Sequence, residues 1–96
     1  MTRVAVDLRR VAARAKLFYA AQVFRDGAAE VYVAGTKEGC LREYQKMRQN
    51  LGSGLRAVRA GPGKPGEARD ALVARVLKEM AVPAAARAAV IVREGA

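Results

Sequence analysis

The chain has 96 residues, and 18 Lys and Arg against 9 Asp and Glu give it a formal net charge of +9, which points to a polyanionic partner. A chain of this length forms one domain, residues 1–96, whose core is thin enough that we expect help from a second subunit. One cysteine, Cys40, and no histidine exclude an internal disulfide, a zinc finger and a Cys-His nucleophile, so no metal and no other cofactor is expected.

The first half of the chain predicts a strand, a helix and a second strand. Residues 3–7 alternate as a short strand does, and residues 11–24 carry apolar side chains at helical spacing. Residues 29–34 are rich in Val and Tyr, which indicates a strand. An alternative interpretation is a hairpin in which residues 17–24 pair with residues 29–34 through Asp26-Gly27, because Asp-Gly is a strong signal for a two-residue turn.

The predicted first helix has a second apolar line on the side away from the first. This line consists of Ala13, Leu17, Ala20 and Phe24. A helix that is apolar on two sides is usually covered on both. We therefore expect a second subunit to cover it, in a homodimer or in a heterodimer with a related protein, and another part of the fold is the alternative.

A second helix is predicted from Thr36, which would cap it, to the turn at residues 52–54. Its inward side chains are expected to be Leu41, Tyr44, Met47 and Leu51, with Cys40 also in the core, while Arg42, Lys46 and Gln49 face water.

The second half predicts a strand at residues 55–60 and an exposed loop at residues 61–66, which hold three glycines and two prolines. Residues 67–81 consist largely of helix-forming types and predict a third helix, although part of this segment also alternates as a strand would. Pro83 ends that element, and residues 88–93 predict the last strand.

Several residues in the first two thirds of the chain match one known family in type and spacing. They are the strand Val4-Ala5-Val6, the closing Arg25-Asp26-Gly27, the strand Ala29-Glu30-Val31-Tyr32-Val33, the turn Gly35-Thr36, and Tyr44 to Gly54 followed by the strand from Leu55. Over about residues 3–60 the chain thus resembles the Alba family of archaeal nucleic-acid-binding proteins.

That resemblance implies a dimer with a β-α-β-α-β core. It also implies a basic pair at the start of the first helix, here Arg9 and Arg10, and a hairpin arm whose tip corresponds to residues 61–66, in which case residues 70–78 are the final strand. The family's glycine-rich second turn is shortened here to Gly35-Thr36-Lys37. The expected fold class is therefore α/β of the α+β two-layer type, with an extra helix or arm before the last strand.

These features together predict a non-enzymatic protein that binds the phosphate backbone of DNA, RNA or both, of the chromatin or ribonucleoprotein type. The candidate contacts are Arg9, Arg10, Arg14, Lys37, Arg56, Arg59, Lys64 and Arg69. DNA and RNA present the same phosphate charge, so these residues do not separate them. The alternative from another class is a homo- or hetero-oligomeric assembly subunit without direct nucleic-acid binding.

The sequence does not favour an enzyme or a membrane-spanning protein. Without histidine no Ser-His pair forms, and Glu38 and Glu43 point in different directions on a helix, so catalysis is not expected. Charged residues interrupt the first apolar stretch, and no later run is long enough to span a membrane. The expected location is the cytoplasm, in association with the nucleoid.

Overall fold

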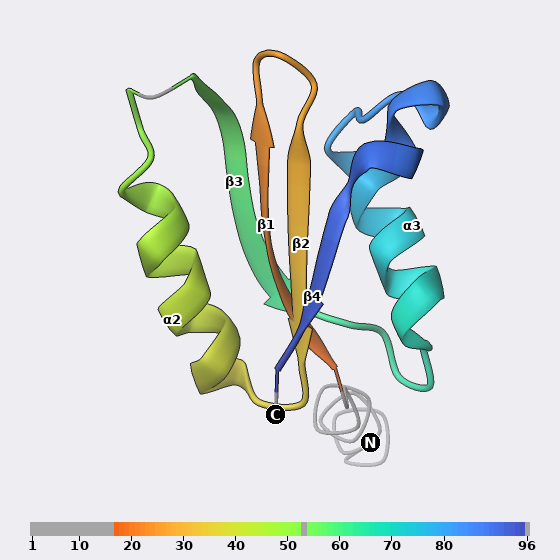
Figure 1. Cartoon of the computed structure of the whole chain (residues 1–96). Coiled ribbons are helices and arrows are strands. Elements are labelled where there is room, and N and C mark those ends of the chain that lie inside the picture. Colours follow the sequence, from red (N-terminus) through yellow and green to blue (C-terminus); the bar gives the residue numbers. More distant parts are fainter. Residues whose placement is uncertain (1–16, 53, 96) are drawn as a thin grey trace, which may run out of the picture.

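The computed structural model describes residues 17–52 and 54–95, and within them a mixed four-stranded sheet is flanked by two helices (Figure 1). In chain order the elements are β1 (Phe18–Phe24), β2 (Ala29–Ala34), α2 (Lys37–Arg48), β3 (Leu55–Pro62), α3 (Arg69–Glu79), the 3-10 helix η1 (Ala84–Ala89) and β4 (Ile91–Glu94). The strand order is β3-β1-β2-β4. β1 is antiparallel to both of its neighbours, whereas β4 runs parallel to β2.

The predicted first helix is wrong over residues 18–24, which form β1 instead. β1 pairs with β2 from Phe18↔Ala34 to Val23↔Ala29, so the hairpin interpretation is confirmed. In the connecting turn Gly27 has a φ of +95°, and Asp26 Oδ1 accepts a hydrogen bond of 2.9 Å from the amide of residue 28. The predicted strand at residues 3–7 and the helix start at residues 11–16 lie outside the described residues.

The two helices cover opposite faces of the sheet (Figure 1). Alternate residues of a strand point to opposite faces. Accordingly Tyr19, Ala21 and Val23 of β1 join the core under α3, while Ala20 is fully buried on the face covered by α2. The core on the α3 side comprises Tyr19, Ala21, Val23, Ala29, Val31, Val33, Leu72, Val73, Val76, Leu77, Met80 and Val82. The chain is thus α+β with three layers rather than the expected two, and the described elements run β-β-α-β-α-β.

Double coverage also removes the reason for expecting a dimer along the predicted first helix. Ala20, a member of that apolar line, is 0% exposed inside this one chain. Leu17 and Phe24 are half-buried, with Leu17 packed against the core on the α3 side, and Ala13 lies outside the described residues. The alternative, in which another part of the same fold covers the line, is confirmed for Ala20.

The predicted second helix is confirmed as α2, and Thr36 is its N-cap, with its hydroxyl oxygen accepting a hydrogen bond of 3.2 Å from the Gly39 amide. Cys40 and Met47 are buried as expected. Leu41 and Leu51, however, are 42% and 62% exposed instead of facing inward. The buried residues of α2 are Gly39, Cys40 and Met47, a narrow stripe that leaves both leucines outside.

The third strand is confirmed and continues to Pro62, which shortens the predicted loop at residues 61–66. Gly63 is buried and its amide donates a hydrogen bond of 2.7 Å to the Leu17 carbonyl, so this part of the loop packs against the body. The third helix is confirmed as α3, which excludes the alternative of a hairpin arm with residues 70–78 as its final strand. The last strand lies at Ile91–Glu94 rather than at residues 88–93, because η1 takes the preceding residues.

Candidate nucleic-acid interface

The carboxylates of the described residues are mostly engaged by four arginines. The ion pairs are Arg59–Glu79, Arg75–Glu67, Arg75–Glu79, Arg69–Asp70, Arg69–Glu94, Arg93–Glu30 and Arg93–Glu43. Among residues 17–52 and 54–95, only Asp26 and Glu38 lack such a pair. The negative charge of the described residues is therefore gathered around these arginines and partly balanced there.

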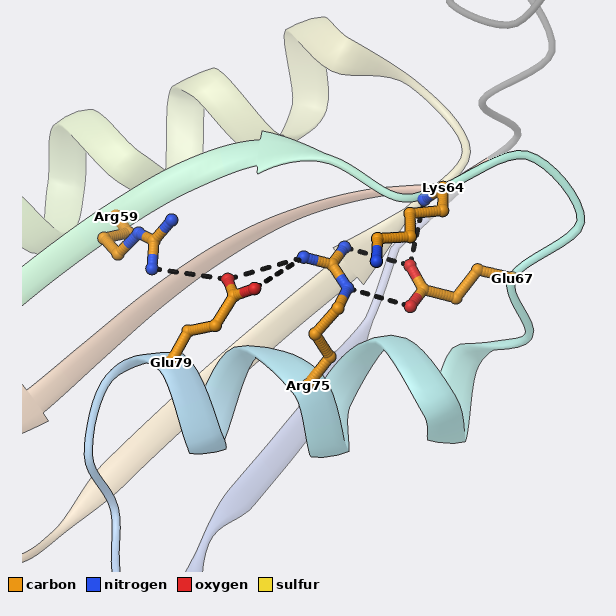
Figure 2. Close-up of polar contacts among 5 residues, drawn as sticks. All are labelled: Arg59, Lys64, Glu67, Arg75 and Glu79. Atoms are coloured by element: carbon orange, nitrogen blue, oxygen red, sulfur yellow. Dashed lines mark hydrogen bonds and ion pairs between the residues drawn. The ribbon is translucent and has the colours of Figure 1, made fainter.

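On the α3 side, Arg75 occupies the centre of a charged chain between β3 and α3 (Figure 2). Its guanidinium donates to Glu67 at 2.9 and 3.0 Å and to Glu79 at 3.3 and 3.4 Å, while Arg59 of β3 reaches Glu79 at 3.4 Å. The hydrogen bonds from Arg75 lower the pKa of Glu67 to about 2. The two arginines of this charged chain are matched by two carboxylates, so these guanidinium groups offer little net attraction to phosphate.

A second cluster, of one arginine and two glutamates, joins β4, β2 and α2. Arg93 Nε donates to Glu30 and its Nη1 donates to Glu43, both at 3.0 Å. The bond from Arg93 lowers the pKa of the Glu43 carboxyl. The same guanidinium lies 5.2 Å from the ring centre of Tyr32. Arg93 thus connects the short edge strand to the rest of the fold and neutralises one of the two carboxylates of α2.

The cations of α2 have no such partners among the described residues. We define the α2 basic face as Lys37, Arg42, Lys46 and Arg48, all of which are exposed and none of which forms an ion pair there. At about 100° per residue, Lys37 and Arg48 share the flank of the helix that carries Leu41, and the other two cations share the opposite flank. Arg48 also lies 5.8 Å from the ring centre of Tyr44.

The residues predicted to contact nucleic acid do not gather on one surface. Lys37 belongs to the α2 basic face, whereas Arg59 and Arg69 are held in ion pairs on the α3 side. Arg56 donates a hydrogen bond of 2.7 Å to the Met80 carbonyl, and Lys64 is exposed before α3. Arg9, Arg10 and Arg14 lie outside the described residues.

Sequence reasoning did not count three members of the α2 basic face as contacts, namely Arg42, Lys46 and Arg48. Arg42 and Lys46 were correctly expected to face water. The spacing of four residues between them on an amphipathic helix was the available signal. What the sequence did not show is that four arginines of the other elements, Arg59, Arg69, Arg75 and Arg93, are already paired with carboxylates.

A groove lies beside the α2 basic face, between α2 and the end of β3. It has a volume of about 430 Å³ and is lined by Phe18, Tyr19, Lys37, Cys40, Leu41, Ala60, Gly61 and Pro62. A Cβ atom on Gly61 would lie 3.3 Å from the Tyr19 ring, so glycine allows β3 to approach that ring closely. Burial raises the pKa of the Cys40 thiol, which keeps it protonated in this apolar wall.

Within residues 17–52 and 54–95, no three His, Cys, Asp or Glu side chains come together in a group that would hold a metal ion. No described helix has the length and apolar character to cross a membrane. Comparisons of the chain with protein-family models, with curated proteins and with solved structures each found no match.

Proposed function

We propose that this chain is a non-enzymatic protein that binds nucleic acid through backbone phosphates, with the α2 basic face as its main contact surface in the part of the chain described. The observation that carries the proposal is the uneven distribution of ion pairs among the described cations. The Arg59, Arg69, Arg75 and Arg93 guanidinium groups face carboxylates, while the four cations of α2 face solvent.

This distribution favours a polyanion because unpaired cations along the exposed side of one helix can each replace condensed counterions at a phosphate. The release of those counterions provides affinity without any reading of bases. A cation that already faces a carboxylate adds little to this effect. Along the helix axis, Lys37 and Arg48 are about 16 Å apart, a length that several successive phosphates of one strand cover. DNA and RNA both supply such phosphates, and the proposed setting is the cytoplasm, on the nucleoid or in ribonucleoprotein.

The test is to measure the affinity for a fluorescent oligonucleotide over a series of salt concentrations. The double variant Arg42→Gln with Lys46→Gln removes two cations from α2 and keeps good helix formers. It should lower the magnitude of the log-log salt slope by about 1 to 2 units and weaken binding to all sequences alike.

A matched control is available in the last turns of the two helices. Lys46 of α2 and Lys78 of α3 are both exposed, and neither forms a described ion pair. Lys46→Gln should reduce the salt slope more than Lys78→Gln, although both remove one charge. Equal effects would mean that net charge alone matters, and an absence of binding at low salt would refute the proposed function.

A second candidate function is assembly with another copy or a related chain, and the free edge of the sheet favours it. β4 is an edge strand of four residues on which Ile91 is 57% and Val92 is 42% exposed. Exposed apolar edge strands are prone to pair with other chains. Ile91→Lys should then convert a dimer into a monomer in light scattering, and an unchanged mass would exclude this edge.

A further inference from the structure

We propose that the groove between α2 and β3 receives an unstacked base of a single-stranded nucleic acid whose phosphates lie on the α2 basic face. The proposal rests on the proposed function and specifies its substrate class. It commits to single strands because a base in a duplex is stacked and paired on its neighbours, and only an unpaired strand can turn a base into a concave site.

The walls of the groove suit a flat, largely apolar group. Half-buried Phe18 and the exposed Leu41 provide aromatic and aliphatic surface on the side of β1 and α2, and Ala60 and Pro62 provide it on the side of β3. A volume of about 430 Å³ lies in the range of small-molecule sites, about 300 to 1,000 Å³. Leu41 is a large apolar side chain left 42% exposed, which a stacked base would cover.

The charge beside the groove fits the strand that would carry such a base. Lys37 lines the groove itself, and Arg48 lies on the same flank of α2 near the Tyr44 ring. No carboxylate is among the described residues that line the groove. A cationic flank next to an apolar and aromatic wall is the combination with which proteins hold single strands, phosphates on one and bases on the other.

The experiment compares two fluorescent single strands of about 12 nucleotides, one of thymidine and one abasic, together with the corresponding duplex. The two strands carry the same phosphates and differ only in bases. If the groove takes a base, the thymidine strand should bind about tenfold tighter than the abasic strand, since base stacking has effects of this size.

Two exposed leucines provide a matched pair of variants. Leu41→Glu places a charge in the groove, while Leu51→Glu adds the same charge at a site that is 62% exposed and outside the groove lining. Leu41→Glu should bring the ratio of the two affinities close to one, and Leu51→Glu should preserve the tenfold ratio. Phe18→Leu, which keeps an apolar side chain and removes the ring, should reduce the ratio several-fold.

The outcomes separate the two proposals. Equal binding of thymidine and abasic strands, with a normal salt slope, would overturn the groove as a base site and leave phosphate binding intact. An equal loss of affinity for the thymidine strand in Leu41→Glu and Leu51→Glu would likewise overturn the groove as a base site. Failure of all three oligonucleotides to bind at low salt would instead overturn the proposed function. If Leu41→Glu does not fold, two measurements still test whether the groove takes a base. They are the comparison of thymidine and abasic strands on the unaltered chain and the same comparison on Phe18→Leu.

Discussion

Arg75 donates two parallel hydrogen bonds to Glu67, from Nε to Oε2 at 2.9 Å and from Nη2 to Oε1 at 3.0 Å (Figure 2). Glu67 also accepts a bond of 2.9 Å from the Lys64 amide. The Glu67 side chain is only 10% exposed, so this pair is better shielded from water than the other ion pairs of the described residues. It fixes the turn after β3 to the middle of α3.

This arrangement predicts a specific loss of stability in acid. The pKa of Glu67 is lowered from 4.5 to about 2, so the folded chain holds the ionised form more strongly than the unfolded chain does. The resulting stabilisation, about 3 kcal/mol, should be complete above pH 4.5 and lost as the pH falls toward 2. Urea unfolding at several pH values should show this loss, and Glu67→Gln should be less stable at pH 7 and converge on the unaltered chain near pH 2.

The control for this prediction is Glu38→Gln. Glu38 is exposed in the first turn of α2 and forms no described ion pair. Its replacement should leave the acid dependence between pH 4.5 and 2 intact. If the free energy of unfolding of Glu67→Gln changed with pH in the same way as that of the unaltered chain, the pair with Arg75 would contribute no pH-dependent stability.

The hairpin turn predicts a second, purely conformational effect. Gly27 has a φ of +95°, and a Cβ atom there would meet nothing within 4 Å. Gly27→Ala should therefore destabilise the chain by about 1 kcal/mol through backbone strain alone. Gly27→Asn should cost less, because asparagine tolerates positive φ better. Chemical denaturation of the two variants checks this order, and equal stability of both with the unaltered chain would contradict it.

How far the sequence predicted the fold depended on whether an element is covered on one face or on two. α2 has one buried stripe and one solvent-exposed face, so its helical periodicity and its Thr36 N-cap could both be predicted from the sequence. β1 is the opposite case, since neighbours on both edges and helices on both faces bury it almost throughout. A strand buried on both faces has the same continuous apolar run as a buried helix segment, and periodicity cannot separate them. Asp26-Gly27 was the local signal that favoured the hairpin.

The sequence predicted the class of partner for the candidate site, but it did not predict which residues form the site. Net charge indicated a polyanion, yet charge alone does not show which cations are already neutralised. Arg69 lies 25 positions from its partner Glu94, and Arg93 lies 50 positions from Glu43. Pairs of this separation depend on the tertiary fold, so Arg59 and Arg69 looked as available in the sequence as Lys37 did.

The basic pair of the Alba resemblance supplies a third prediction. Replacing Arg9 and Arg10 with Ala removes two positive charges, and folding should change by only about 0.5 kcal/mol. If both side chains meet phosphate, the magnitude of the log-log salt slope should fall by about two units on duplex DNA. Fluorescence anisotropy at a series of salt concentrations measures this slope. A folded double variant with the original slope and affinity would show that the two arginines are ordinary surface charge.

The last prediction sets a free cation against a paired one. Lys37→Gln and Arg59→Gln each remove one positive charge, but Lys37 is exposed at the start of α2 without a described carboxylate partner, whereas Arg59 reaches Glu79 at 3.4 Å. A phosphate that approached Arg59 would also approach Glu79, whose repulsion offsets most of the attraction. Lys37→Gln should therefore lower the magnitude of the salt slope by about one unit, while Arg59→Gln should change it by a small fraction of that. Because Arg75 continues to hold Glu79 at 3.3 Å, Arg59→Gln should also keep the fold, which thermal unfolding would verify. If Arg59→Gln reduced the slope as much as Lys37→Gln, the ion pair would open on binding, and the contact surface would have to include the α3 side of the sheet.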